Sequence, residues 1–207
     1  MSAETITRSV TEKVKEAKPG TVFFPIDLLE FGAPDAIHQT FSRLARNKTL
    51  LRLAKGIYVK PTMDPELGAL RPSLEAVAQQ IAEHDRVVIR PTGAAALNKL
   101  GLSTQVPTKV VYMTNGNPKR IQVGRSTIVF KKTTNKQLAV QPEAVFLAIQ
   151  ALIALRDQAD NPDIIRQLTE VLGVEKPVDI REGARLAPQR IGRILYQIAN
   201  NIEKSPT

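Results

Sequence analysis

The chain contains neither cysteine nor tryptophan, and only two histidines occur among its 207 residues. Without cysteine it has no disulfide framework, no thiol nucleophile and no cysteine-ligated zinc or iron–sulfur centre. No segment approaches the run of about eighteen apolar residues that a membrane-spanning helix needs. The opening sequence MSAETITRSV also lacks the apolar centre of a signal peptide. We therefore expect a cytoplasmic protein that makes no contact with a membrane.

Acidic residues are missing from a long central stretch, since residues 86–140 contain neither Asp nor Glu. Metal-dependent phosphodiester chemistry needs several acidic ligands close together, and no Gly-Ser motif followed by paired aspartates occurs. Neither histidine belongs to a group of ligands with a spacing typical of a metal site. We expect His38 on the flank of a helix, where it can at most approach a phosphate, and His84 at a helix end. The sequence therefore predicts no enzyme, no catalytic residue, no metal site and no cofactor.

Basic residues are plentiful, with 29 Lys and Arg against 20 Asp and Glu and a formal net charge of +9. A charge of this size indicates a polyanionic partner. The excess is uneven near the start of the chain. Residues 34–60 carry six bases against one acid, Asp35, whereas residues 1–33 carry four bases against five acids. Within the first sixty residues, the positive charge is therefore concentrated in residues 34–60.

That segment predicts an amphipathic helix followed by a short hairpin. Ile37, Phe41 and Leu44 recur on one helical stripe from Pro34 onward, and polar and basic residues fall on the opposite face. Two apolar runs then follow, over residues 50–53 and 57–59, and Gly56 lies in the turn between them. Two further helices are expected upstream, one carrying an apolar stripe from Ile6 to Ala17 and one over residues 24–31. Three helices and a hairpin predict a winged helix-turn-helix over residues 1–62.

The polar face of the predicted helix carries side chains suited to reading a DNA groove. Arg can donate two hydrogen bonds to guanine and Gln can pair with adenine, whereas Ser more often contacts phosphate. The plain alternative is a solvated helix face without a ligand. The residues that we expect to contact double-stranded DNA are Gln39, Ser42, Arg43, Arg46, Lys48, Arg52 and Lys55.

A second domain is expected after a linker at residues 63–72, within a segment that holds three prolines and a glycine. Residues 73–207 then predict a mixed α/β domain with a helical C-terminal part, so that the fold class of the chain is α+β. The expected elements are helices at 73–84 and 94–100, strands at 86–90 and 109–114, a hairpin of 120–123 with 127–131, and helices at 142–156, 162–172 and 188–202.

The second domain also carries a basic excess, because residues 66–140 hold eleven bases and four acids. This charge can contact phosphates of RNA or of flanking DNA, or it can simply keep the surface soluble. The turn Pro91-Thr92-Gly93 lies between a strand and a helix, where an anion can bind, with tight strand–helix packing as the default explanation. The candidate contacts for phosphate or nucleic acid are Thr92, Gly93, Lys119, Arg120, Arg125, Lys131 and Lys132.

Two stretches give the sequence a family resemblance. The stretch FSRLARNKTLLRLAKGIYVKP, followed by RPTGAAALNKLGLSTQVPTKVVYMTNG and a basic hairpin, resembles the AbiEi-type antitoxins of type IV toxin–antitoxin systems, bacterial regulators first described in abortive phage infection. The resemblance covers roughly residues 5–135, and the sequence from residue 141 does not match motif by motif. Its most distinctive groups are Thr92-Gly93, Leu97-Asn98, Leu100-Gly101-Leu102 and the run from Tyr112 to Gly116.

The resemblance implies a winged helix that binds inverted repeats in the promoter of its own operon. It also implies a second domain needed for antitoxicity, and a nucleotidyltransferase-like toxin from the adjacent gene that the antitoxin opposes without a stable complex. From the residues and the resemblance together we expect a sequence-specific transcriptional repressor acting as such an antitoxin. Two alternatives stay open. One is an RNA-binding accessory protein that uses the basic hairpin of the second domain, and the other is a non-catalytic protein-interaction scaffold.

The last predicted helix bears on the oligomeric state. Ile191, Ile194, Leu195 and Ile198 recur at helical spacing, which favours packing in the core over an oligomer surface. A homodimer would suit a DNA site made of paired half-sites, but no self-complementary patch can be located in the sequence.

Overall fold

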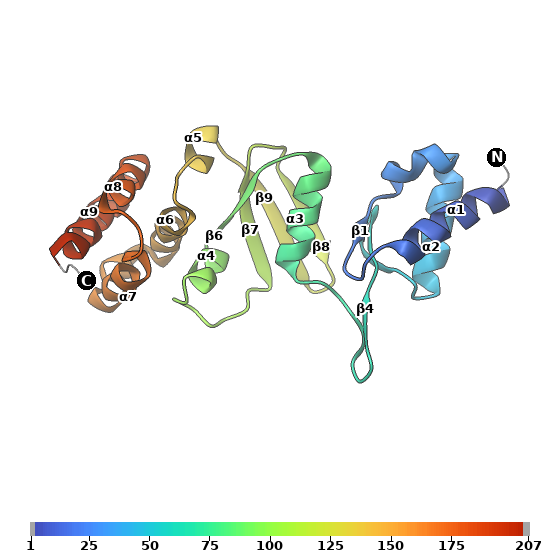
Figure 1. Ribbon diagram of the computed structural model, residues 1–207, viewed down its shortest axis with the longest axis horizontal. Coiled ribbons are helices and arrows are strands. Elements are labelled where there is room, and N and C mark those ends of the chain that lie inside the picture. Colours follow the sequence, from blue (N-terminus) through green and yellow to red (C-terminus); the bar gives the residue numbers. More distant parts are fainter. Residues whose placement is uncertain (1–2, 205–207) are drawn as a thin grey trace. The chain divides into compact units, whose positions relative to one another are not determined.

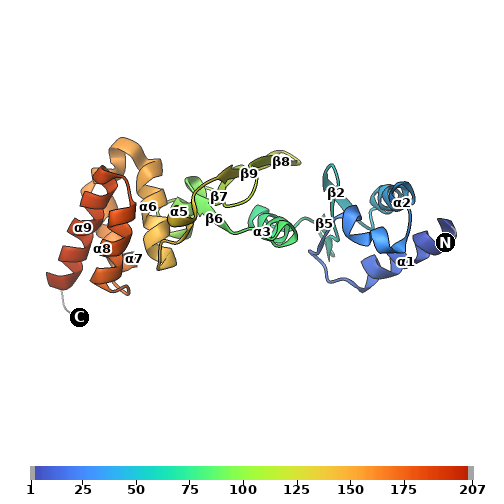
Figure 2. The same ribbon diagram turned by 90° about the horizontal axis from the view of Figure 1, so that it is seen from above.

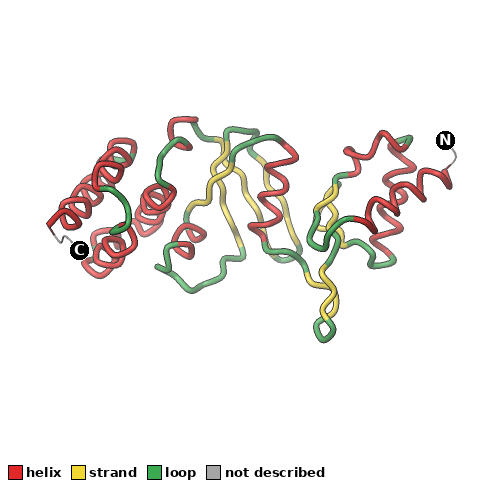
Figure 3. The backbone as a smooth tube through the Cα atoms, viewed as in Figure 1, coloured by secondary structure: helices red, strands yellow, loops and turns green. Residues whose placement is uncertain are grey.

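The computed structural model describes residues 3–204 and has a mixed α+β architecture, as the sequence predicts (Figures 1 and 3). The chain divides into two compact units, Met1–Asp85 with Ile121–Ser126, and Arg86–Arg120 with Thr127–Thr207. This division differs from the expected domains 1–62 and 73–207, since residues 74–85 group with the first unit. No helix among residues 3–204 has the length and apolar character that a membrane span requires.

The first unit begins with three helical segments around one core. They are α1 (Ala3–Glu16), the 3-10 helix η1 (Pro25–Phe31) and α2 (Pro34–Arg46). Val10 and Val14 of α1 pack with Ile37 and Phe41 of α2, and all four side chains are fully buried. The helical stripes that the sequence predicts therefore form the core, although the second segment winds as a 3-10 helix.

A small sheet follows the helices. Strands β2 (Leu51–Ala54) and β3 (Ile57–Val59) form the expected hairpin, and β1 (Val22–Phe23) pairs with β3, so that the order is β1-β3-β2 and all pairs are antiparallel. Gly56 lies in the turn with a φ of 72°, a conformation that glycine adopts without strain. Three helical segments followed by this hairpin give the arrangement of a winged helix-turn-helix.

The expected linker is a structured part of the first unit. Strands β4 (Thr62–Asp64) and β5 (Gly68–Leu70) pair as an antiparallel hairpin, and helix α3 (Leu74–Asp85) follows. Ser73 caps α3, as its position predicts, because its Oγ accepts the amide N–H of Ala76.

Helix α3 is tied to the winged helix by side-chain contacts. The Gln80 side chain accepts the amide N–H of Val22 at 2.7 Å and donates to the carbonyl of Gly20 at 3.0 Å. The His84 ring stacks on Phe24 with 3.8 Å between centroids, and its Nε2 lies 3.1 Å from the Asp27 carboxylate. These contacts explain why α3 groups with the first unit.

A mixed sheet has the strand order β6-β7-β9-β8, and its strands belong to the second unit except for residues 121–126 at the β8–β9 turn. Strand β6 is antiparallel to β7, and β7 is parallel to β9. Helix α4 (Ala94–Lys99) joins β6 to β7. The bounds of the strands are Ile89–Thr92 for β6, Lys109–Thr114 for β7, Lys119–Val123 for β8 and Ser126–Lys132 for β9.

Strand β6 lies later in the chain than the expected strand 86–90, and Arg90 gives the reason. Its buried guanidinium donates to the carbonyls of Leu138 and Val140 and lies 3.6 Å from the ring centroid of Phe146. The strand is therefore centred on this anchored residue, whereas Val88 is 52% exposed. Burial also lowers the pKa of the Arg90 guanidinium, with a smaller opposing effect from Glu143.

The rest of the second unit is helical, as expected. Helix α6 contacts strand β6 on one side and the other long helices on the other (Figure 2). This core contains the apolar stripe of the last helix, namely Ile191, Ile194, Leu195 and Ile198. The prediction that this stripe packs in the core is therefore confirmed. The helices are α5 (Asn135–Leu138), α6 (Glu143–Leu155), the 3-10 helix η2 (Arg156–Asp160), α7 (Pro162–Leu172), α8 (Pro177–Leu186) and α9 (Gln189–Lys204).

Helix α8 was not expected from the sequence. Its interior contains Gly183, a poor helix former that weakens the helical pattern. The structure shows why a glycine is accommodated there, because an added Cβ would lie 2.3 Å from Cγ1 of Val145 in α6. The absence of a side chain thus permits close packing of α8 on α6.

Candidate nucleic-acid interface

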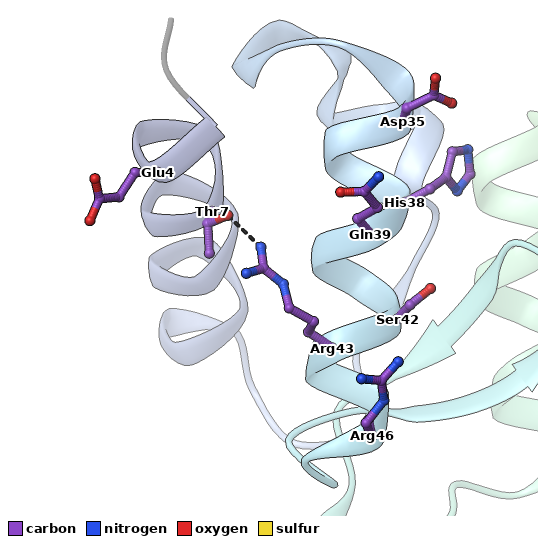
Figure 4. A pocket seen from close by; sticks show the side chains of 8 residues that line it. All are labelled: Glu4, Thr7, Asp35, His38, Gln39, Ser42, Arg43 and Arg46. Atoms are coloured by element: carbon purple, nitrogen blue, oxygen red, sulfur yellow. Dashed lines mark hydrogen bonds between the residues drawn. The ribbon is translucent and has the colours of Figure 1, made fainter.

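The outer face of α2 is exposed and carries the expected contact residues (Figure 4). Gln39, Ser42, Arg43 and Arg46 project from it, whereas Ile37, Phe41 and Leu44 are buried on the opposite side. Together with Thr7 of α1, the four residues line an open groove of about 760 Å³. The structure therefore brings together four of the seven residues that we expected to contact DNA.

Arg43 is held in place by hydroxyl groups. Its Nη2 donates to Oγ1 of Thr7 at 2.6 Å and lies 3.3 Å from Oγ1 of Thr40 in its own helix. Both partners are neutral, so the charge of the guanidinium is not compensated. Arg46 is exposed, and no acid forms an ion pair with either arginine among residues 3–204. Both cations remain available to an anionic ligand.

Thr7 is a functional candidate that the sequence analysis missed. The bond between Thr7 and Arg43 joins residues 36 positions apart, so no local sequence pattern predicts it. The one available signal in the sequence was that Thr7 directly follows Ile6, which is buried in the core of the unit. Glu4 and Asp35 also line the groove. A carboxylate at such a position can accept a hydrogen bond from the amino group of cytosine, and it repels phosphate.

The hairpin of β2 and β3, which forms the wing, and the residues just before it carry the other expected cations. Lys55 is exposed in the turn between β2 and β3, and Lys48 is exposed just after α2. Arg52 is also exposed, and its Nε lies 3.4 Å from the carbonyl oxygen of Ala54. These three side chains lie on the surface of the winged helix, as contacts to a phosphate backbone require.

Lys60, the last basic residue of the segment 34–60, has a different role. Its Nζ donates to the carbonyls of Lys15 at 2.6 Å and Ala17 at 2.7 Å, just at and beyond the C-terminal end of α1. A cation at this end satisfies carbonyls that lack helical partners. Its charge is therefore used within the fold.

The candidate contacts expected in the second domain fall into two groups. Thr92, Gly93, Lys131 and Lys132 line one cavity, which the other candidates do not reach. Lys119 is partly buried, with its Nζ 5.4 Å from the ring centroid of Phe130. The remaining two are exposed: Arg120 lies in β8 and Arg125 in the hairpin turn.

Gly93 departs from the default explanation of tight packing. A Cβ at this position would meet no atom within 4 Å, so packing does not require the glycine. Its φ of 58° does favour glycine. Helix α4, which follows it, has only six residues.

The histidines lie apart from one another. His38 is exposed on α2, and His84 lies between the carboxylates of Asp27 and Asp85. Within residues 3–204 no three His, Asp or Glu side chains form a group that could hold a metal ion.

Comparison with known proteins finds a matching family and solved structures of similar fold. A model of DUF6088, described as a family of unknown function, matches residues 9–180. The crystal structure of the RV2827C protein from Mycobacterium tuberculosis is similar over 94% of this chain and 81% of that chain, with 14% sequence identity and a TM-score of 0.48. No curated protein matches the chain in sequence.

Proposed function

The chain belongs to the DUF6088 family, and we propose that it binds double-stranded DNA sequence-specifically as a transcriptional repressor. The observation that carries this proposal is the exposed face of α2, where Arg43 and Arg46 keep their charges free of acidic partners. A helix of this kind can enter a major groove when the helices behind it form a rigid support. The three helical segments supply that support through the buried core that they share with Leu50 and Tyr58.

The roles of the side chains follow from their chemistry. Arg43 and Arg46 donate to guanine edges and Gln39 pairs with adenine, because each can form two hydrogen bonds to its base. Thr7 positions Arg43 and reduces the conformational freedom that binding would otherwise remove. Ser42 contacts a phosphate oxygen.

The wing and its neighbours supply contacts that do not depend on sequence. Lys48, Arg52 and Lys55 neutralise phosphates and release bound counterions, so that the affinity falls as the salt concentration rises. The operator is a pair of inverted half-sites, which a homodimer would match by its two-fold symmetry.

We extend the proposal to regulation of the chain's own operon as a type IV antitoxin in the cytoplasm. The support is the resemblance over residues 5–135 to AbiEi-type antitoxins. On this proposal the second unit opposes a nucleotidyltransferase-like toxin from the neighbouring gene without a stable complex, and the chain itself has no enzymatic activity.

The test is a fluorescence anisotropy titration of the full chain. The ligands are a duplex from the region upstream of its gene, a scrambled duplex of equal composition, and an RNA of the upstream sequence. We expect preferential binding of the upstream duplex that weakens steeply with salt. Lys13→Ala on α1, an exposed lysine outside the groove, should bind as the wild type does.

Two outcomes would overturn the proposal. Stronger binding of the RNA would favour the alternative in which the second unit binds RNA. Equal binding of both duplexes, or no salt-dependent binding at all, would leave the α2 face without a role in sequence recognition and would favour an interaction scaffold.

A further inference from the structure

The second unit contains a cavity of about 560 Å³ between its sheet and helix α6. Strands β6, β7 and β9 contribute one part of the lining, and the C-terminal end of α6 contributes another. Cavities of about 300–1,000 Å³ are typical of small-molecule sites. Its size therefore suits a ligand larger than a free inorganic ion.

Three cationic residues line the cavity without an acidic residue among the lining. Lys131 and Lys132 are exposed at the end of β9, and Arg156 is exposed where α6 ends. None of the three has an ion-pair partner in the described part of the chain. Arg156 has a φ of 50°, a backbone conformation that side-chain-bearing residues rarely adopt. The cavity thus presents concentrated positive charge.

A buried polar side chain adds a second, independent observation. Gln150 of α6 lines the cavity and is only 7% exposed, and no side-chain hydrogen bond to it is found among residues 3–204. Its amide atoms are still open to the cavity, because no fully buried side-chain nitrogen or oxygen among the described residues lacks a hydrogen-bond partner. A ligand in the cavity would supply donors and acceptors for Gln150.

The remaining lining is apolar and gives the site two different parts. Val111 and Met113 of β7 face the cavity together with Ile153 of α6, which is 42% exposed. Met113 pairs in register with Lys131, so the apolar and cationic linings are adjacent. A ligand that matches both parts has a polyanionic group and a flat, weakly polar group.

We propose that this cavity binds a nucleoside di- or triphosphate. Lys131 and Arg156 hold the phosphates by charge-assisted hydrogen bonds. The base and ribose lie against Val111, Met113 and Ile153, and Gln150 pairs with a polar edge of the ligand. This site is independent of DNA binding by α2, so either proposal can fail alone.

The test is isothermal titration calorimetry of the full chain with ATP and GTP, and with AMP, tripolyphosphate and a single-stranded oligonucleotide as comparison ligands. We expect saturable binding of one nucleoside polyphosphate at one site per chain. Lys131→Gln and Arg156→Asn should each weaken it by at least about tenfold, since each removes a charge-assisted contact.

Two further variants separate ligand binding from folding. Gln150→Leu should weaken nucleotide binding while leaving the thermal unfolding temperature about unchanged, because the Gln150 amide has no hydrogen bond within the described part of the chain to lose. Lys109→Gln, at an exposed lysine of β7 outside the cavity, is the matched control and should bind as the wild type does.

Four outcomes of these titrations would overturn the proposal. The proposal is overturned if neither triphosphate binds saturably. It is also overturned if the Lys131→Gln and Arg156→Asn variants bind the triphosphate as tightly as the wild type does. Tripolyphosphate binding as tightly as ATP would mean an anion site without recognition of the nucleoside. Competition by the oligonucleotide at lower concentration than by either triphosphate would mean a polynucleotide site, and either result overturns the assignment.

Discussion

The Nη2 of Arg43 in α2 donates a hydrogen bond of 2.6 Å to Oγ1 of Thr7 in α1. This bond fixes the guanidinium through a neutral partner and leaves its charge available to a ligand. A carboxylate in place of Thr7 would neutralise the same guanidinium. The choice of partner thus distinguishes an arginine prepared for binding from one that only stabilises the fold.

Replacing Thr7 by valine should therefore weaken specific DNA binding. The change keeps the shape of the side chain and removes the hydroxyl, at a loss of about 0.5–1.5 kcal/mol, or about two- to tenfold in Kd. The measurement is anisotropy with the upstream duplex. Thr11→Val is the control, because the Thr11 hydroxyl bonds only within α1 to the carbonyl of Thr7. A Thr7→Val protein with wild-type affinity would refute the positioning role.

Arg43→Ala and Lys55→Ala should weaken DNA binding in different ways. Loss of Arg43 should cost about 1–3 kcal/mol on the specific duplex and relax the base preference, because a base contact disappears. Loss of Lys55 should weaken specific and scrambled duplexes alike and reduce the slope of log K against log salt by about 1. Titrations at several salt concentrations separate the two patterns. Equal losses on scrambled DNA for both variants would contradict the assigned roles.

Lys60→Met should destabilise the winged helix without a direct effect on DNA contacts. It removes two charge-assisted hydrogen bonds to the carbonyls of Lys15 and Ala17. We expect a loss of about 1–3 kcal/mol in the free energy of unfolding. Urea unfolding followed by circular dichroism measures this loss, with exposed Lys18→Met as the control. An unchanged stability together with weaker DNA binding would mean that Lys60 contacts DNA instead.

Gly183→Ala should destabilise the second unit, although alanine is normally the better helix former. The new methyl group would overlap Cγ1 of Val145, a stiff β-branched neighbour, at an expected cost of about 1–3 kcal/mol. The double variant with Val145→Ala should lose less than the sum of the two single losses, by at least about 0.5 kcal/mol. Additive losses would show that the two positions do not interact.

Acid should weaken the contact between α8 and α9. The Arg181 guanidinium bonds both carboxylate oxygens of Glu203, at 2.7 and 2.6 Å, and holds the pKa of Glu203 below its ordinary value. This contribution to stability is present above the ordinary pKa of about 4.3 and is lost as the pH falls through the lower pKa of the folded state. Urea midpoints of the wild type and Arg181→Met between pH 7 and pH 3 should therefore converge at the acidic end. A constant difference would contradict this linkage.

Local patterns in the sequence were sufficient to predict the winged helix. The stripe of Ile37, Phe41 and Leu44 and the turn at Gly56 depend on neighbours within a few residues, where helical period and turn chemistry act directly. The exposed positions of Arg43 and Arg46 follow from the helical period, and that of Lys55 follows from its place in the turn. Their capacity to bind DNA remains a prediction.

Contacts between distant residues account for what the sequence analysis missed. The bond from Arg43 to Thr7 and those from Lys60 to the end of α1 join segments 36 to 45 residues apart. Helix α8 was missed because Gly183 disfavours a helix in the sequence, and the close packing of Gly183 on Val145 exists only in the folded unit. Gln150 gave one usable signal, as the single polar residue within the apolar run VFLAIQALIAL.

The most direct test of the central claim is selection of bound duplexes from a randomised DNA pool by the full chain. The claim is that the exposed face of α2 recognises a DNA sequence. Wild-type protein should enrich a common motif present in the region upstream of its gene, and the double variant Arg43→Ala, Arg46→Ala should enrich none. No motif with the wild type, or the same motif with the double variant, would contradict it.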